Sequence, residues 1–127
     1  MKNYVGTVSI HVNDQDRAKK FYTEAFGWKV LNDAPMGDDA RWLSVGPSGD
    51  ETEIVLVKGF GDWSPEKVGV RTNVIIECQN VFETVKTLKE KGAEITQEAS
   101  SEPWGGWAMF KDSEGNEFGL HSDPKNT

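Results

Sequence analysis

The feature that most constrains the fold is a segment that occurs twice, a helix with a polar residue before it and a glycine after it. Asp14 precedes the first predicted helix, which ends at Gly27, 13 positions later. Asn80 and Gly92 bracket the second predicted helix, 12 positions apart. A short polar side chain can accept hydrogen bonds from the first helical turn, and glycine readily adopts the left-handed conformation that ends a helix. Because about 65 residues separate the copies, we interpret the chain as two copies of one unit.

The residues around both helices predict strands in a repeated order. In chain order the predicted strands are residues 4–12, 28–31, 41–45 and 52–58 in the first half, and residues 72–78, 93–97, 107–111 and 117–122 in the second. Each half therefore has the order β-α-β-β-β. We expect one domain over residues 1–127, with repeats at about 4–58 and 72–122 and a linker at 59–71.

The composition limits the partners. The chain has 14 Lys and Arg against 21 Asp and Glu, a net charge of -7. A negative chain repels nucleic-acid phosphates and anionic membranes, so we predict neither as a partner. Cys78 is the single cysteine and cannot form an internal disulfide. Together with a start that does not resemble a signal peptide, this predicts a cytoplasmic protein.

Polar residues alternate with apolar ones on the first and last predicted strands. Thr7, Ser9 and His11 share one face of the first strand, and Gly119 and His121 share one face of the last. We expect the apolar rows to pack on the helices and the polar rows to line an enclosed face, with a solvated sheet face as the alternative. The only two histidines are far apart in sequence, so they cannot form a compact His-x-x-x-His site.

The chain contains five tryptophans, which favour cores and binding surfaces alike. Trp104 and Trp107 flank two glycines, and with Trp42 they are candidate walls of a pocket. The alternative is that one of the pair only caps the core. No Gly-x-Ser-x-Gly motif is present, and Cys78 has no basic neighbour in sequence that would make it a nucleophile.

Two motifs point to a known family. Residues 12–28 contain Val-Asn-Asp-x-x-Arg-Ala-x-x-Phe-Tyr-x-x-x-Phe-Gly-Trp, and residues 110–118 read Phe-Lys-Asp-Ser-Glu-Gly-Asn-Glu-Phe. They resemble the opening and the closing hairpin of the vicinal oxygen chelate superfamily, with Ser113 where proline is usual. That superfamily includes glyoxalase I, extradiol dioxygenases, and fosfomycin- and bleomycin-resistance proteins. The resemblance implies an α+β fold of two β-α-β-β-β repeats, whose curved mixed sheets form a cup, and a homodimer.

In the metal-dependent members, the resemblance implies four metal ligands on four strands. The positions that match them are Thr7, Val55, Asn73 and Gly119. None supplies the imidazole or carboxylate that a transition ion needs, so we expect no cofactor. A divalent metal held by a displaced set of His11, Glu53 and His121 is the alternative.

We therefore predict that the chain binds a small molecule in a sheet-lined cup without a metal, as the resemblance to the bleomycin-resistance branch implies. The expected ligand-binding residues are Thr7, Ser9, His11, Trp42, Asn73, Trp104, Trp107 and His121. Whether the chain is an enzyme stays open, with His11 the best candidate for acid–base catalysis. The alternatives are a metal-dependent lyase, isomerase or dioxygenase that uses the displaced set, and an assembly module with an unused cup.

Overall fold

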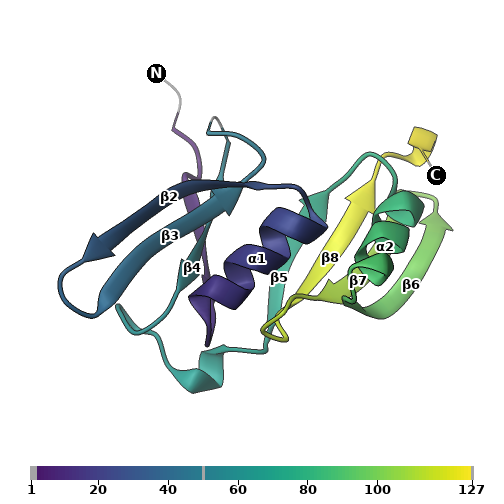
Figure 1. The fold of residues 1–127 in the computed structure, drawn as a ribbon. Helices are drawn as coiled ribbons and strands as arrows, with labels where there is room; N and C mark the ends of the chain where they lie inside the picture. Colours follow the sequence, from purple (N-terminus) through teal and green to yellow (C-terminus); the bar gives the residue numbers. More distant parts are fainter. Residues whose placement is uncertain (1–2, 50, 127) are drawn as a thin grey trace. The chain divides into compact units, whose positions relative to one another are not determined.

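The computed structural model describes residues 3–49 and 51–126, which fall into two units. The first unit ends at Val68 and the second begins at Gly69. In each, an α-helix packs on an open four-stranded sheet, in the order strand, helix, then three strands (Figure 1). This is the repeated order that the sequence predicts, so the α+β fold of two β-α-β-β-β repeats with mixed sheets is confirmed.

The strands have the same relative order in both sheets. The first unit contains β1 (Thr7–His11), α1 (Gln15–Ala25), β2 (Lys29–Met36), β3 (Ala40–Gly46), β4 (Glu53–Val57) and a short 3-10 helix (Pro65–Lys67). The second contains β5 (Arg71–Glu77), α2 (Val81–Glu90), β6 (Glu94–Glu102), β7 (Gly105–Lys111), β8 (Glu117–Ser122) and a 3-10 helix (Pro124–Asn126). The sheet orders are β1-β4-β3-β2 and β5-β8-β7-β6. In each sheet the first strand runs parallel to the last, and the other pairs are antiparallel.

Both helices begin and end as the sequence predicts. The Asp14 carboxylate accepts a hydrogen bond from the Arg17 amide at 2.9 Å, and the Asn80 side chain accepts from two amides of the first turn of α2. Gly27 and Gly92 follow the helices with φ values of 68° and 85°. These positive values favour glycine because it has no Cβ to clash with the neighbouring backbone.

Each sheet buries one face against its own helix. In the first unit the buried apolar residues of α1 and the sheet include Ala18, Tyr22, Ala25, Ile10, Leu43, Val45, Ile54 and Leu56. In the second they include Val81, Val85, Leu88, Ala108, Phe110, Phe118 and Leu120. These residues alternate along the strands, as expected for a sheet with one face on a helix. The side chains between them lie on the opposite face of each sheet, where the candidate site is found.

Two strands are each four residues longer than the sequence predicts. β2 continues to Met36 beyond the predicted end at residue 31, through a segment of turn-like composition, and β6 continues to Glu102 beyond the predicted end at residue 97. Both are edge strands, where a proline such as Pro35 is tolerated because its missing N–H faces no partner strand. From the neighbouring strand β3, the Arg41 guanidinium donates two hydrogen bonds to the carboxylate of Asp33 on β2, at 2.7 and 2.8 Å. Cross-strand pairing therefore overrides the turn-like composition.

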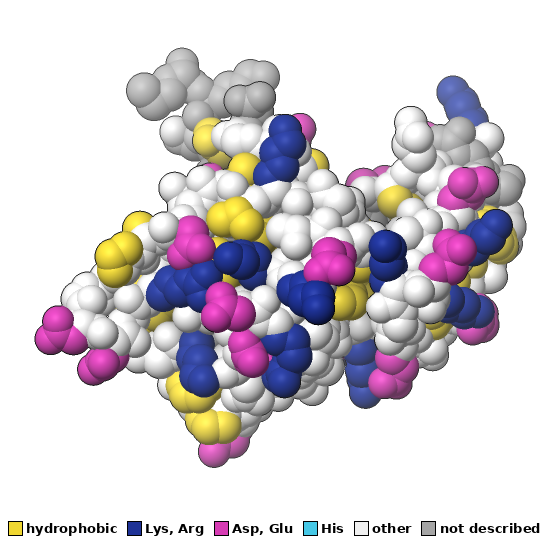
Figure 2. Space-filling view, viewed as in Figure 1, with side chains coloured by type: hydrophobic (Ala, Val, Ile, Leu, Met, Phe, Trp, Pro, Cys, Tyr) yellow, Lys and Arg dark blue, Asp and Glu magenta, His cyan; other side chains and the backbone are white. Residues whose placement is uncertain are grey.

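The surfaces that carry the helices are charged. Figure 2 shows Lys and Arg side chains interspersed with Asp and Glu side chains over α1 and α2. Opposite charges pair there, for example Arg41 with Asp16 and Lys89 with Glu98. Within the described part of the chain, neither helix is long and apolar enough to cross a membrane.

The hairpin between β7 and β8 is held by buried polar side chains. The Asp112 carboxylate accepts from the Glu114 and Asn116 amides at 2.8 and 2.9 Å. The Asn116 side-chain oxygen accepts from the amides of Gly69 and Val70 at 2.7 and 3.2 Å, so it fixes the hairpin to the segment that leads into β5. These contacts give the second family-like motif a structural role.

Replacing Asn116 with alanine is expected to destabilise the protein by about 2–3 kcal/mol, because the amides of Gly69 and Val70 lose their acceptor. Urea unfolding measures this loss. Ser113→Ala in the same hairpin is the matched control and should cost less than about 0.5 kcal/mol. Equal losses in the two variants would show that the Asn116 contacts contribute nothing specific.

Candidate functional site

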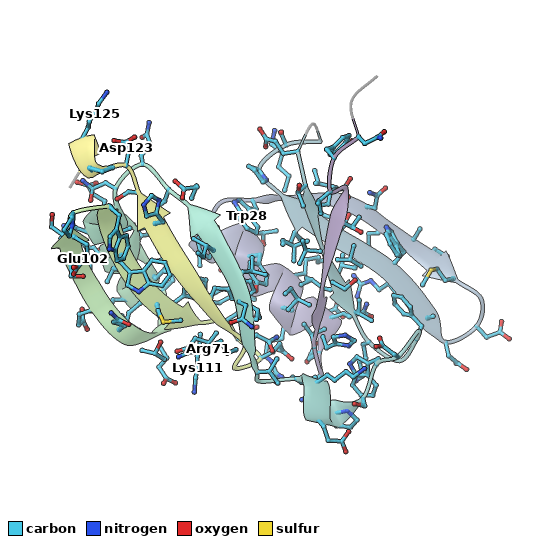
Figure 3. The ribbon with its side chains drawn as sticks, turned by 180° about the vertical axis from the view of Figure 1, so that it is seen from behind. Trp28, Arg71, Glu102, Lys111, Asp123 and Lys125 are labelled. Atoms are coloured by element: carbon cyan, nitrogen blue, oxygen red, sulfur yellow. The ribbon has the colours of Figure 1, made fainter. Side chains whose placement is uncertain are left out.

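The face of the second sheet opposite α2 carries three rows of residues that cross β5, β8 and β7. From the register, the rows are Arg71, Glu117 and Lys111; Ile75, Gly119 and Met109; and Glu77, His121 and Trp107. Figure 3 shows Arg71 and Lys111 together at one end of this sheet, and Glu102 and Asp123 toward the other. The face therefore has a charged row, an apolar row and a row with a histidine and an aromatic ring.

The indole of Trp107 covers the backbone of Gly119. A Cβ placed on Gly119 would lie 2.5 Å from Cη2 of Trp107, closer than two carbon atoms can approach. A side chain at residue 119 therefore requires the indole to move away. Gly119 is also the position where the resemblance implies a metal-binding glutamate, so the ring covers the place where that carboxylate would begin.

His121 is held on both sides of its ring. Its Nδ1 lies 2.6 Å from a carboxylate oxygen of Glu77, and its Nε2 lies 2.8 Å from the backbone oxygen of Trp104. Since both partners are acceptors, the doubly protonated ring satisfies both contacts. The Trp104 carbonyl, with the larger effect, and the Glu77 carboxylate both raise the pKa of His121. The ring also stacks on Trp104, with centroids 6.1 Å apart and planes inclined by 18°. His121 thus fixes Trp104 and offers no free nitrogen to a metal or a substrate proton.

Raising the pH is expected to weaken the folded state through His121. Because the folded state raises this pKa, its contribution is fully present below the unfolded-state pKa of about 6.5 and is lost as the pH rises through the folded-state pKa. Urea unfolding of the protein and of His121→Gln, from about pH 5.5 to about pH 9, measures the difference, which should shrink as the pH rises. A constant or growing difference would contradict the protonated state assigned to the ring.

The corresponding face of the first sheet is polar around Glu53. One carboxylate oxygen of Glu53 accepts from the Ser44 hydroxyl at 2.6 Å and from the Asn32 amide at 3.0 Å. Val55, the match to a second metal ligand, pairs with Ser9 and is 1% exposed. The Glu53 carboxylate is therefore engaged by β2 and β3, and the adjacent strand position is apolar and buried.

His11 lies at the end of β1 on the same face. Its Nε2 is 4.0 Å from a carboxylate oxygen of Asp62, in the segment that follows β4. The Trp63 indole in that segment donates to the Val12 backbone oxygen at 2.9 Å. The first part of the predicted linker is thus anchored to the end of β1, beside His11.

The structure brings some of the predicted site residues together within each unit. In the second unit Trp104, Trp107 and His121 form one cluster, with the indoles 5.7 Å apart in an edge-to-face arrangement. In the first unit, Thr7, Ser9 and His11 alternate along β1 with the apolar residues that face the helix, and Trp42 lies on β3, with its ring 6.4 Å from Phe60.

Asn73 lies in an irregular part of β5. It has a φ of 61°, and the pairing of β5 with β8 shifts between Arg71 and Ile75. As a result Ile75, and not Asn73, pairs with Gly119. Asn73 is exposed within this irregular part of the strand. The bulge has little sequence signal, since the only hint is that asparagine tolerates left-handed backbone better than most residues.

Sequence reasoning missed Arg71, Ile75, Glu77 and Met109 as residues of this face. Strand periodicity could have found Met109, which lies two positions from Trp107 on β7. It could also have found Ile75 and Glu77, which lie two and four positions from Asn73 on β5. It could not have paired Arg71 with Glu117, because the register of β5 shifts between Arg71 and Ile75.

The side chains do not fit the divalent transition ion that the resemblance implies. Val55 and Gly119 supply no side-chain donor atom, one oxygen of the Glu53 carboxylate is bound by Ser44 and Asn32, and both nitrogens of His121 are engaged. Over residues 3–49 and 51–126, no cluster of three or more His, Cys, Asp or Glu side chains could hold a metal. The chemistry that remains is apolar and aromatic contact, with charged groups at the ends of the face.

Comparisons with known proteins agree with this fold. A family model described as Glyoxalase/Bleomycin resistance protein/Dioxygenase superfamily matches residues 4–120. The protein YetH of Bacillus subtilis (strain 168) is 36% identical over 118 residues, which cover 93% of this chain and 97% of YetH. The crystal structure of TnmS3, an antibiotic binding protein from Streptomyces sp. CB03234, has a TM-score of 0.81 and 35% identity, covering 96% of this chain and 97% of TnmS3. Lactoylglutathione lyase GLX1 of Arabidopsis thaliana is 30% identical over 89% of this chain, which matches only 42% of that lyase.

Proposed function

Since the chain belongs to the Glyoxalase/Bleomycin resistance protein/Dioxygenase superfamily, we propose that it binds a small organic molecule without a metal ion. The binding surface is the face of the second sheet opposite α2, around Trp107 and Gly119. TnmS3, a structural relative over nearly the whole chain, is described as an antibiotic binding protein, and this similarity supports small-molecule binding.

The observation that carries the proposal is an apolar and aromatic surface, partly exposed, that lies next to the charged row of the second sheet. Ile75 and Trp104 are 56% and 53% exposed, whereas large apolar side chains in a soluble domain are usually covered. Trp107 lies between them over Gly119, and its ring is edge-on to Trp104. Flat indole faces next to small residues favour a ligand with a planar apolar part.

The predicted binding residues divide between the two sheet faces in this proposal. On the second unit they are Asn73, Trp104, Trp107 and His121, where His121 acts by holding Trp104 in place. On the first unit they are Thr7, Ser9, His11 and Trp42, whose polar groups would orient a ligand on that face.

The test is a titration of isotope-labelled protein with 2-naphthamide, a planar neutral probe, in buffer that contains EDTA. We expect saturable shifts of the indole N–H signals of Trp104 and Trp107. The Trp63 indole, which donates to the Val12 backbone oxygen, is the internal control and should not shift. Phe82→Ala on α2 is the matched variant and should bind equally well. Shifts confined to α2, or no saturable shift, would overturn the proposal.

A second candidate function is a metal-dependent lyase, favoured by the similarity to lactoylglutathione lyase. It requires the displaced set of His11, Glu53 and His121, and the contacts of Glu53 and His121 oppose that use. Metal analysis of protein purified without chelators separates the two functions. Stoichiometric Zn, Ni, Mn or Fe would favour the lyase, and a metal content far below one ion per chain would favour metal-free binding.

The family resemblance also leads us to propose a homodimer. Exposed apolar side chains near the edge strands support it, since Tyr4 and Val5 precede β1, and Val70 precedes β5. Apolar groups of this kind are commonly covered in protein interfaces. Light scattering during size-exclusion chromatography should give twice the mass of the chain, and the mass of a single chain would contradict the proposal.

A further inference from the structure

The charged row of the second sheet contains a carboxylate with both oxygens engaged. One oxygen of Glu117 lies 2.9 Å from Nε of Arg71, and the other accepts from the Thr96 hydroxyl at 2.5 Å. The Thr96 hydroxyl and the Arg71 guanidinium hold the pKa of Glu117 below its usual value. Glu117 is therefore a fixed anion that orients the Arg71 guanidinium.

Arg71 retains binding capacity beyond this contact. Its side chain is 65% exposed, and only Nε takes part in the ion pair with Glu117. Its two terminal amino groups have no acceptor among the residues that the structure describes. An arginine fixed through Nε presents these amino groups as a planar fork, which matches a carboxylate.

Lys111 places a second cation in the same row. It pairs with Glu117 across β7 and β8, and its Nζ lies 3.9 Å from a carboxylate oxygen of Glu94, a distance too long for a strong hydrogen bond. Figure 3 shows Lys111 and Arg71 at the same end of the sheet. The positive charges of Arg71 and Lys111 are balanced by the negative charges of Glu117 and Glu94. The chain as a whole has a net charge of -7. An anion would therefore be recognised by short directed contacts and not by a long-range field.

The charged row lies next to the apolar row on the same face. Glu117 and Gly119 are two positions apart on β8, a separation of about 6.5–7 Å along a strand. A fused two-ring acid spans a similar distance from its outer ring to its carboxylate. One molecule can thus contact both rows.

We propose that Arg71 binds a carboxylate of the ligand, whose planar aromatic part packs against the Trp107 indole that covers Gly119, so that the ligand class is planar aromatic acids. Glu117 is a positioning residue that acts through Arg71. This inference rests on the proposed function, and it adds the chemical class of the ligand.

The experiment compares 2-naphthoate with 2-naphthamide, which share the ring system and differ in charge. The unmodified protein is expected to bind the acid about tenfold more tightly than the amide, as for a charge-assisted bidentate contact. Arg71→Gln should remove this preference by weakening the binding of the acid much more than that of the amide. Lys86→Gln on α2 removes one positive charge from another surface and should keep the preference. Arg71→Lys should keep only part of it, because an ammonium group has no planar fork.

Equal binding of acid and amide by the unmodified protein would overturn the inference, as would a preference that persists in Arg71→Gln. The proposed function would stand in both cases, because the amide would still bind at Trp107. Failure of both probes to bind would overturn the proposed function itself. The indole signals of Trp104 and Trp107 report folding of each variant, and if Arg71→Gln is unfolded, a full preference in Arg71→Lys would overturn the directed contact.

Discussion

Replacing Gly105 with alanine is expected to destabilise the protein by roughly 3–5 kcal/mol, the largest loss of stability that we predict for a single methyl group. Gly105 opens β7 with a φ of 124°, where residues with a side chain are strained. An added Cβ would lie 2.2 Å from the backbone oxygen of Ser122 and 2.7 Å from Nε2 of His121. The backbone cannot withdraw without breaking the pairing of β7 with β8. The methyl group would also displace His121 from the Trp104 carbonyl.

Urea unfolding of Gly105→Ala measures this loss, and Gly92→Ala is the matched control. Gly92 has a φ of 85° but nothing within 4 Å of an added Cβ, so that its substitution should cost only about 1–2 kcal/mol of backbone strain. The difference between the variants isolates the collision with Ser122 and His121. Equal losses would mean that the hairpin adjusts freely, and the fixed position of Trp104 would then be in doubt.

Replacing Trp107 with alanine is expected to weaken binding of 2-naphthamide by roughly 10- to 100-fold, the largest effect on binding that we predict. The indole supplies the flat apolar surface over Gly119, and its loss leaves bare backbone there. Trp104 also loses the ring that it meets edge-to-face. Since Trp107 is half-buried on the sheet face opposite α2, the fold should survive its removal.

The titration that follows the Trp104 indole signal measures this effect. Trp107→Phe keeps an aromatic ring and should retain part of the affinity, whereas Phe82→Ala removes a ring from α2 and should leave it unchanged. Binding to Trp107→Ala with unaltered affinity would remove the second sheet face as the binding surface.

The fold could be predicted because its strongest signals are local. Asp14 and Asn80 cap the helices, Gly27 and Gly92 follow their ends, and each contact involves residues close in sequence. The lengths of β2 and β6 could not be predicted, because they depend on pairing with β3 and β7. Pairing energy from a neighbouring strand outweighs the weak turn preference of a segment such as the one around Pro35.

The candidate site could be predicted only where the strands are regular. Period-two alternation placed His121 and Gly119 on one face of β8. The bulge at Asn73 changes the register of β5, so the sequence did not indicate that Ile75 lies opposite Gly119. The protonation state of His121 could not be predicted from the sequence either. One of its hydrogen-bond acceptors is the backbone oxygen of Trp104, which comes near only when β7 and β8 pair in the folded protein.

A crystal structure of the protein with 2-naphthoate, with anomalous data collected at transition-metal absorption edges, examines metal-free binding at Trp107 most directly. We expect the naphthalene ring packed against the Trp107 indole, the carboxylate at Arg71, and no anomalous signal near His11, Glu53 or His121. A transition ion bound by these three residues, or a ligand seated away from Trp107, would contradict the account.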